Sequence, residues 1–350
     1  MIRRARWALR AISIQSDLIP EFHPLFRNPH LLTLAGNFWK RRLDELRFPP
    51  ARKVYRITDC ISVVALEHQP ELAAKAQIIL LHGLEGSADS GYMRSFTQAA
   101  LESGFGVHRL NLRTCGGTET LSETMYHSGL TSDTLAVADD ISKRFNQPVC
   151  LIGFSLGGNV VLKLAGELGE TDLIAAVCAV SPPIDLARCV KAIDKRVNLL
   201  YARRFLDRLK QRIARKSVTS PASYTTEGLK AVRSIWEFDD RYTAPLFGFG
   251  TAENYYRTQS AQNFLHQIRV PTLIVTAKDD PLVPFEMFSH SSLNANPSIT
   301  LAATEHGGHL GFLAKKAPRF WVEQFLLQWV EGIVHKQAER TSQPHSFALL

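Results

Sequence analysis

From residue 77 onward, two kinds of segment alternate along the chain, and this alternation constrains the fold more than any other feature. Short apolar, β-branched runs are separated by stretches whose apolar residues recur at helical spacing. The apolar runs are QIILLHG, FGVHRLNLR, PVCLIGFS, AAVCAVSPP, PTLIVTAKDD and ITLAATEH. Runs that are apolar throughout are typical of strands covered on both faces. The pattern predicts an α/β fold with a mostly parallel central sheet flanked by helices.

A long segment, residues 183–269, interrupts the alternation. It is rich in Arg, Tyr and Phe, begins with a helical period and continues with aromatic-rich loops. Because the strand pattern resumes after it, we interpret this segment as a mainly helical lid inserted between two strands of a single core. The core then comprises residues 51–182 and 270–337, preceded by an N-terminal extension, residues 1–50, that packs on it. Residues 338–350 are expected to form a mobile tail.

The formal net charge of +8 raises the question of a nucleic-acid or membrane partner. The basic residues gather in a few local clusters, and no zinc-finger spacing or RNA-binding motif accompanies them. We therefore expect no nucleic-acid partner; the clusters form either a solvated helical face or a peripheral contact with an anionic membrane. Five cysteines without a C-x-x-C pair indicate free thiols, and the sequence shows neither a signal-peptide cleavage site nor a membrane-spanning run. These features favour a cytoplasmic protein.

The run LIGFSLGGNV has the spacing G-x-S-x-G, with Ser155 at its centre. A β-run enters the motif and a helical pattern leaves it, which predicts a sharp strand-to-helix turn. Such a turn strains the serine backbone and needs small neighbours, here Gly153 and Gly157, with Gly158 following. The N-terminus of the new helix points its N–H groups at the same place. We predict that Ser155 is a nucleophile; a turn without catalytic role is the alternative.

A serine hydroxyl needs a base that takes its proton and an acid that orients the base. After such a turn, the acid and then the histidine follow in chain order, each at the C-terminal end of a strand. TLIVTA runs into Asp279 and Asp280, and ITLAATE runs into His306 and His309. We prefer Asp280, the fourth residue of the turn A-K-D-D, and His309, because two glycines let its loop fold over the serine. Asp279 and His306 remain the alternatives.

The tetrahedral intermediate of such a reaction needs two backbone N–H donors. We expect one from Leu156, the residue after the nucleophile, and one from Leu84, in the loop that follows the first long core strand. Four supporting residues surround Leu84 in the sequence: His82, Gly83, Glu85 and Gly86. The two glycines shape the turn, and the other two residues either hold the loop by hydrogen bonds or contact the substrate.

Together these motifs resemble the YheT-like branch of the α/β-hydrolases, which is related to the ABHD lipases and esterases. The matching pieces run in order across about residues 20–330: FRNPHLLTL, HGLEGS, YHSG, GFSLGGN, EFDDRYTAPLFGF with ENYY, TAKDDP and EHGGHLGF. The resemblance implies an α/β-hydrolase fold and a serine carboxylesterase or lipase-like activity, with Ser155, Asp280 and His309 as the catalytic triad. One departure is Thr114 in NLRTCGG, where relatives more often have glycine, and it concerns the local shape of that loop.

We therefore predict a serine hydrolase that cleaves carboxylic esters through an acyl-enzyme intermediate. The expected substrate is a small ester with an apolar acyl group of short or medium length, or a monoacylglycerol-like lipid. Aromatic residues of the lid are expected to shape its pocket: Phe205, Trp236, Tyr242, Phe247, Phe249, Tyr255 and Tyr256. The alternatives are thioester hydrolysis or acyl transfer by the same triad, and a catalytically silent binding module.

No cofactor is expected, and no metal, because neither H-E-x-x-H, nor clustered Cys and His, nor G-x-G-x-x-G occurs. The sequence leaves the oligomeric state open.

Overall fold

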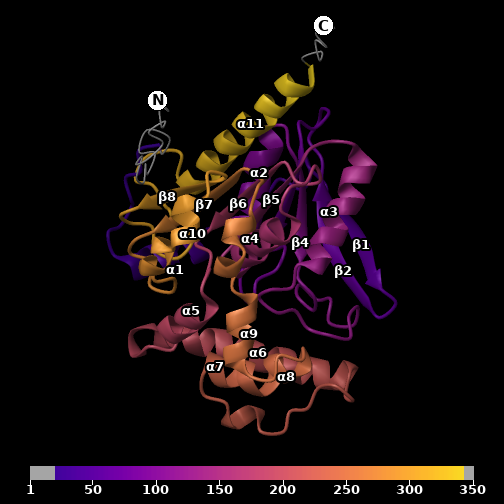
Figure 1. Cartoon of the computed structure of the whole chain (residues 1–350), viewed down its shortest axis with the longest axis vertical. Coiled ribbons are helices and arrows are strands. Elements are labelled where there is room, and N and C mark those ends of the chain that lie inside the picture. Colours follow the sequence, from indigo (N-terminus) through magenta and orange to yellow (C-terminus); the bar gives the residue numbers. More distant parts are fainter. Residues whose placement is uncertain (1–19, 343–350) are drawn as a thin grey trace, which may run out of the picture.

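A computed structural model describes residues 20–342 of the chain, and Figure 1 shows how its elements are arranged. The strands are β1 (Ala51–Thr58), β2 (Ile61–His68), β3 (Gln77–Leu81), β4 (Gly106–Asn111), β5 (Val149–Phe154), β6 (Ala176–Val180), β7 (Thr272–Ala277) and β8 (Ile299–Thr304). They form one sheet in the order β1-β2-β4-β3-β5-β6-β7-β8. Pairing is antiparallel from β1 to β2 and from β2 to β4, and parallel between all other neighbours. The predicted mostly parallel sheet is confirmed.

The five strands from β4 to β7 in the sheet order are buried on both faces. Every residue of β3, β4, β5, β6 and β7 is buried, whereas the edge strands β1 and β8 include residues that solvent reaches. Helices α3 (Ser132–Phe145) and α4 (Leu156–Leu168) contribute to one buried apolar cluster with the strands, and α2 (Gly91–Glu102) and α11 (Trp321–Ser342) to the other. Two such clusters, one on each face, explain why the strand sequences are apolar throughout.

The segment before the sheet packs on the core in the part that the structure describes. Helix α1 (Pro29–Phe38) begins at the N-cap Asn28, whose side chain accepts a hydrogen bond from the N–H of Leu31. Leu43 and Phe48 lie in the same apolar cluster as α2 and α11. The first 19 residues of the predicted N-terminal extension lie outside the described residues.

Between β6 and β7 the chain leaves the sheet and forms a group of helices, which lies below the sheet in Figure 1. These are α5 (Leu186–Ile193), α6 (Leu199–Thr219), α7 (Ile235–Phe238), α8 (Ala244–Leu246) and α9 (Ala252–Gln259). We call residues 186–259 the lid. Two apolar clusters are built largely from its own side chains, so the lid has a packed interior apart from the sheet. The remaining short helices are η2 (Arg196–Asn198), η3 (Leu229–Ala231), the π-helix η4 (Asp239–Thr243), η5 (Ala261–Asn263), η6 (Leu265–Gln267), η7 (Phe285–Ser289) and α10 (Ser291–Ala295).

Two predicted boundaries differ from the structure. The lid was expected to extend to residue 269, but Ala261, Leu265 and Ile268 are buried in the same cluster as α4, so the chain has already returned to the core there. The tail was expected from residue 338, but α11 continues to Ser342. Residues 336–339, with the sequence KQAE, are mostly polar but good helix formers, and His335 contacts Glu339 at 3.2 Å, one turn along the helix. Residues 343–350 lie outside the described part.

Within residues 20–342, no helix combines the length and the apolar character needed to cross a membrane.

Candidate active site

Ser155 lies where β5 ends and α4 begins, as the motif predicts. Its φ is +52° and its ψ is −119°, a strained conformation for a residue with a side chain. The neighbouring glycines are needed because a Cβ on Gly153 would lie 2.2 Å from the carbonyl oxygen of Gly157, and one on Gly157 would lie 2.5 Å from that of Leu81. A Cβ on Gly158 would lie 2.9 Å from the Pro182 side chain. Close backbone packing therefore fixes the position of Ser155.

The side chains of Ser155, His309 and Asp280 lie in one hydrogen-bonded row. His309 Nε2 is 2.9 Å from Ser155 Oγ, and His309 Nδ1 is 2.9 Å from Asp280 Oδ2. The other Asp280 oxygen accepts hydrogen bonds from the N–H groups of Leu282 and Val283. Because a carboxylate only accepts, Nδ1 carries the proton, and Nε2 is left to accept the proton of the serine hydroxyl. This arrangement allows the proton of Ser155 Oγ to pass to His309 Nε2.

The two alternative residues pair with each other beside this row. Asp279 Oδ2 is 3.1 Å from His306 Nδ1, and Asp279 Oδ1 accepts a hydrogen bond of 2.9 Å from the N–H of Gly308. These contacts attach the end of β7 to the loop that carries His309. Asp279 and His306 thus brace the loop and make no hydrogen bond to Ser155 among the contacts of the described residues.

Helix α1 also holds the histidine loop. The N–H of His309 donates to Thr33 Oγ1 at 2.8 Å, and that hydroxyl donates to the carbonyl oxygen of Pro29 at 2.7 Å. Gly308, with a φ of +58°, lets the loop approach so closely that a Cβ there would lie 2.5 Å from the same Pro29 oxygen. Sequence reasoning did not identify Thr33; its only signal was the position within FRNPHLLTL.

The loop with Leu84 lies against Ser155, because a Cβ on Gly83 would lie 3.1 Å from the serine Cβ. Gly83 N–H donates to the Tyr92 hydroxyl at 2.9 Å, and Glu85 N–H donates to the Tyr126 hydroxyl at 3.0 Å. By contrast, no acceptor among residues 20–342 binds the N–H of Leu84 or of Leu156. These two N–H groups are available to a ligand on Ser155. Gly86 N–H closes the turn onto the Gly83 carbonyl oxygen at 3.0 Å.

His82 is fully buried and holds this loop. The N–H of Leu112 donates to His82 Nε2 at 3.2 Å, so the proton is on Nδ1, which donates to the Gly83 carbonyl oxygen at 2.8 Å. Burial lowers the pKa of His82 to about 4, so the ring is neutral at physiological pH. Of the two roles considered for His82, the structure supports the structural one.

We expect the protonation of His82 to destabilise the fold in acid. Between pH 6.5 and about 4 the unfolded chain binds a proton at this position and the folded chain does not, so the free energy of unfolding falls as the pH is lowered. This loss reaches on the order of 2–3 kcal/mol at pH 4. His82→Gln should flatten the slope, measured by urea unfolding between pH 7 and 4.5.

Burial also lowers the pKa values of His68 and His127, so the slope with His82→Gln should decrease and not vanish. His266→Gln, at an exposed position, is the control. An unchanged slope for His82→Gln would contradict the prediction.

Glu85 joins the loop to the lid. Its φ is +55°, and both carboxylate oxygens accept hydrogen bonds of 2.9 Å from Arg212 of α6. The Tyr126 hydroxyl donates to the same carboxylate, and Arg208 donates to the Glu85 carbonyl oxygen. The two paired side chains are only 2% (Glu85) and 4% (Arg212) exposed, so water screens this ion pair very little.

Thr114, the departure from the family pattern, takes part in the same network. Its φ is +61°, the left-handed region that glycine would adopt without strain. Arg212 Nη1 donates both to its carbonyl oxygen and to its hydroxyl, the latter at 3.0 Å. The threonine therefore adds a side-chain acceptor for the arginine that a glycine does not have.

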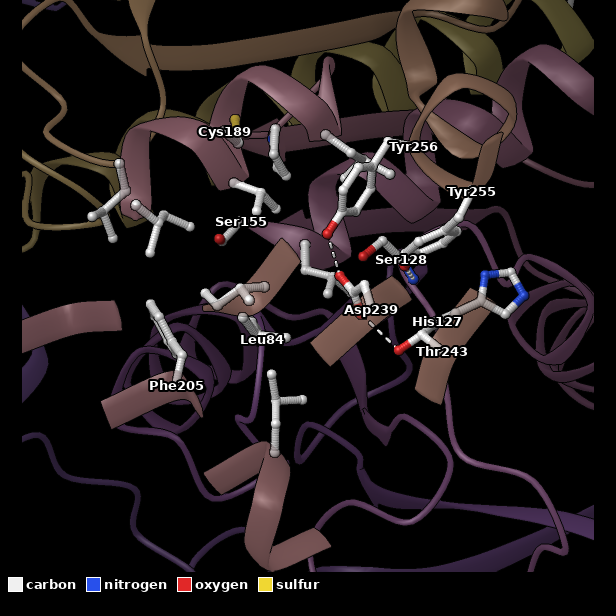
Figure 2. A pocket seen from close by; sticks show the side chains of 18 of the residues that line it. Leu84, His127, Ser128, Ser155, Cys189, Phe205, Asp239, Thr243, Tyr255 and Tyr256 are labelled. Carbon is white, nitrogen blue, oxygen red and sulfur yellow. Dashed lines mark hydrogen bonds between the residues drawn. The ribbon is translucent and has the colours of Figure 1, made fainter. Parts of the chain in front are cut away.

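Two cavities meet at Ser155. The first extends under the lid (Figure 2), and the second runs between α1 and α6. Their free volumes are about 80 and 140 Å3, several times the roughly 10–15 Å3 that one water molecule needs. Most residues around the first cavity are apolar, and they include Leu186, Val190 and Ile235 of the lid. This wall suits an apolar group attached to the atom that Ser155 attacks.

Only some of the predicted lid aromatics face this cavity. Phe205, Tyr255 and Tyr256 line it. The other four pack elsewhere: Trp236 on Tyr256, Tyr242 on Phe238, and Phe247 and Phe249 on His127. An aromatic residue in the sequence is expected to be buried, but the sequence does not tell whether its ring lines a cavity or packs on another side chain.

The motif EFDDRYTAP holds the lid together beside the cavity. Asp239 accepts hydrogen bonds from the hydroxyls of Tyr256 and Thr243, at 2.5 and 2.6 Å, as drawn in Figure 2. Asp240 accepts one from the N–H of Ala252 at 2.8 Å. Burial raises the pKa of Asp239 to about 6. These contacts join η4 to α9.

Among the described residues, no group of three or more His, Cys, Asp or Glu side chains is placed to hold a metal ion.

Comparisons with known proteins agree with this architecture. The family model described as alpha/beta hydrolase fold matches residues 77–316. YheT of Escherichia coli (strain K12) is 32% identical over 319 residues, which cover 89% of this chain and 93% of YheT. The monoacylglycerol lipase of Saccharomyces cerevisiae is 29% identical over 273 residues, which cover 74% of this chain and 59% of the lipase.

A solved structure, the Pyrococcus furiosus esterase Pf2001, shares the fold with a TM-score of 0.53 at 16% identity, over 86% of this chain and 98% of the esterase. The predicted α/β-hydrolase fold and the resemblance to the YheT-like branch are therefore confirmed. The chain belongs to the α/β-hydrolase family, in the branch that includes YheT.

Proposed function

We propose that the protein is a serine hydrolase that cleaves carboxylic esters. The observation that carries the proposal is the row of contacts from Asp280 through His309 to the strained Ser155, each step 2.9 Å long. A buried carboxylate that fixes the histidine tautomer, with the free ring nitrogen on a serine hydroxyl, is the arrangement that activates a serine nucleophile.

In the proposed reaction, Ser155 Oγ attacks the ester carbonyl carbon while its proton passes to His309 Nε2. The N–H groups of Leu84 and Leu156 stabilise the negative oxygen of the tetrahedral intermediate. His309 then gives the proton to the departing alcohol, leaving an acyl-enzyme. Water repeats the attack with the same base, and the acid product leaves. Asp280 keeps the proton on Nδ1 and stabilises the charged ring.

In this proposal, the acyl group of the ester occupies the first cavity, and its alcohol part points toward the second cavity. Support comes from the apolar wall of the first cavity and from its position next to Ser155. The relatives named as a monoacylglycerol lipase and an esterase act on this class of bond. We therefore propose esters with a short or medium acyl chain, or monoacylglycerol-like lipids, as substrates.

A fluorophosphonate probe tests the proposal because it modifies only an activated serine. We expect the wild-type protein to be labelled on Ser155, as located by peptide mapping, and Ser155→Ala to remain unlabelled. Hydrolysis of acetate, butyrate, octanoate and monoacylglycerol esters, with matched thioesters and added alcohol acceptors, then separates ester hydrolysis from thioester hydrolysis and acyl transfer. A folded wild-type protein that takes no label and cleaves none of these compounds would favour the silent binding module.

A further inference from the structure

The outer face of α1 is apolar although solvent reaches it. Leu31, Leu34 and Phe38 are 52%, 42% and 64% exposed. At positions i, i+3 and i+7 they lie along one side of the helix. Single exposed apolar side chains are common on protein surfaces, but a continuous row of them indicates a contact with another apolar surface.

The first turns of α6 lie next to this row. Leu200 is 80% exposed, and the Arg204 guanidinium is 5.3 Å from the centre of the Phe38 ring. Leu200, Arg204 and Arg208 share one face of α6, at i, i+4 and i+8. We call the residues of these two faces the entrance surface: Leu31, Leu34, Phe38, Leu200, Arg204 and Arg208.

The charge of the entrance surface is not neutralised by the protein. Farther along α6, Arg212 pairs with Glu85 and Arg215 with Glu119. Within residues 20–342, Arg204 and Arg208 have no carboxylate at ion-pair distance. Two arginines one turn apart repel each other, so an anion placed near both stabilises them.

The entrance surface borders the way to Ser155. Four of its residues, Leu34, Phe38, Arg204 and Arg208, line the second cavity, and Ser155 lines the same cavity. A molecule that covers this surface therefore faces the opening through which an ester reaches the nucleophile.

We propose that the protein docks on an anionic lipid surface through the entrance surface and takes its ester substrate from that surface. Exposed apolar side chains enter the boundary between headgroups and acyl chains, while adjacent arginines bind the anionic headgroups. The chain's own first residues, which begin MIRRARWALR, do not complement Arg204 and Arg208, because they are basic as well. The source of the substrate rests on the proposed function, whereas the docking does not.

Flotation of the full-length protein with vesicles tests the docking. The Ser155→Ala background keeps lipid turnover out of the measurement. We expect binding to vesicles of phosphatidylcholine with about 30% phosphatidylglycerol, weaker binding at high salt and little binding to phosphatidylcholine alone. The double variant Phe38→Glu with Leu200→Glu should lower the bound fraction of protein about ten-fold or more. Its two glutamates replace two apolar side chains that would be buried in the lipid surface. The matched control is Leu46→Glu with Leu72→Glu, at positions that are 98% and 84% exposed and outside the entrance surface.

Flotation that is equal for the two double variants would overturn the proposal. So would a wild-type protein that does not float but forms a dimer that Phe38→Glu dissociates, since the partner would then be a second copy of the chain. With an active Ser155, Leu31→Glu combined with Leu200→Glu, two positions that line neither cavity, should show a lower ratio of vesicle-ester to dissolved-ester hydrolysis. Hydrolysis of neither ester by the wild type would remove the proposed function and the substrate source, and leave the flotation result standing.

Discussion

Ser155→Ala and His309→Ala are each expected to lower kcat by about 10⁴-fold or more, because the nucleophile and its base act as one unit. Asp280→Asn should reach a similar loss, since an amide donates a hydrogen bond and would favour the wrong tautomer of His309. The measurement is steady-state hydrolysis of an ester that the wild-type protein cleaves. Circular dichroism confirms that each variant is folded.

The neighbouring pair provides the matched controls. His306 contacts Asp279 and makes no hydrogen bond to Ser155, so His306→Ala should cost no more than about ten-fold in kcat, the effect of a loosened loop. Asp279→Asn keeps an oxygen that accepts from Gly308 N–H and should also have a small effect. A loss with His306→Ala as large as that with His309→Ala would mean that the base is wrongly assigned.

Arg212→Met is expected to destabilise the protein by about 3–5 kcal/mol, because it leaves the carboxylate of Glu85 buried without its cation. The same change should lower kcat by about 10- to 100-fold, approaching the cost of a lost oxyanion donor, since Glu85 follows Leu84 directly. KM should change less, because the loop N–H groups act mainly on the transition state. Urea unfolding gives the stability, and kinetics well below the unfolding midpoint give kcat and KM.

Arg215→Met is the control on the same helix. Arg215 contacts Glu119 at 2.9 Å, but its side chain is 50% exposed, so its removal should cost at most about 0.5 kcal/mol. Adding Glu85→Gln to Arg212→Met should recover part of the stability, because the unpaired charge disappears. Equal stability of the two arginine variants would show that the pair with Glu85 does not hold the loop.

The sequence was most informative where neighbouring residues determine the geometry. The change from strand to helix around G-F-S-L-G locates Ser155, because a strained turn there requires glycines on both sides. Chain order then located Asp279 or Asp280 and His306 or His309, since the C-terminal ends of parallel strands meet at one edge of the sheet. The turn A-K-D-D and the two glycines favoured Asp280 and His309. The contacts among these three residues are present in the structure, and their catalytic role stays a prediction.

Contacts between distant segments were not predictable in this way. Thr33 accepts a hydrogen bond from the N–H of His309, which is 276 residues away in the sequence. Arg212 and Glu85 form an ion pair although 127 residues separate them. In the sequence, Arg212 is one of many basic residues in a helical stretch, and its burial depends on where the lid folds back onto the core. The sequence left Glu85 two possible roles and did not identify Arg212 as its partner.

The end of the lid was misjudged for a related reason. The apolar pattern there is short and belongs to no strand; it consists of Ala261, Leu265 and Ile268. The local sequence therefore does not distinguish a core segment from a lid segment. The start of the tail was misjudged because polar residues that suit a helix also suit a disordered end.

The order of the strands has a consequence for biosynthesis. Ser155 and His309 are 154 residues apart, and the whole lid lies between them in the chain. During synthesis, Ser155, the lid and Asp280 are therefore made before His309, which follows strand β8, the partner of β7 at the edge of the sheet. The proposed mechanism therefore predicts that a chain that ends before His309 has no hydrolase activity, even where Ser155 and the lid are complete.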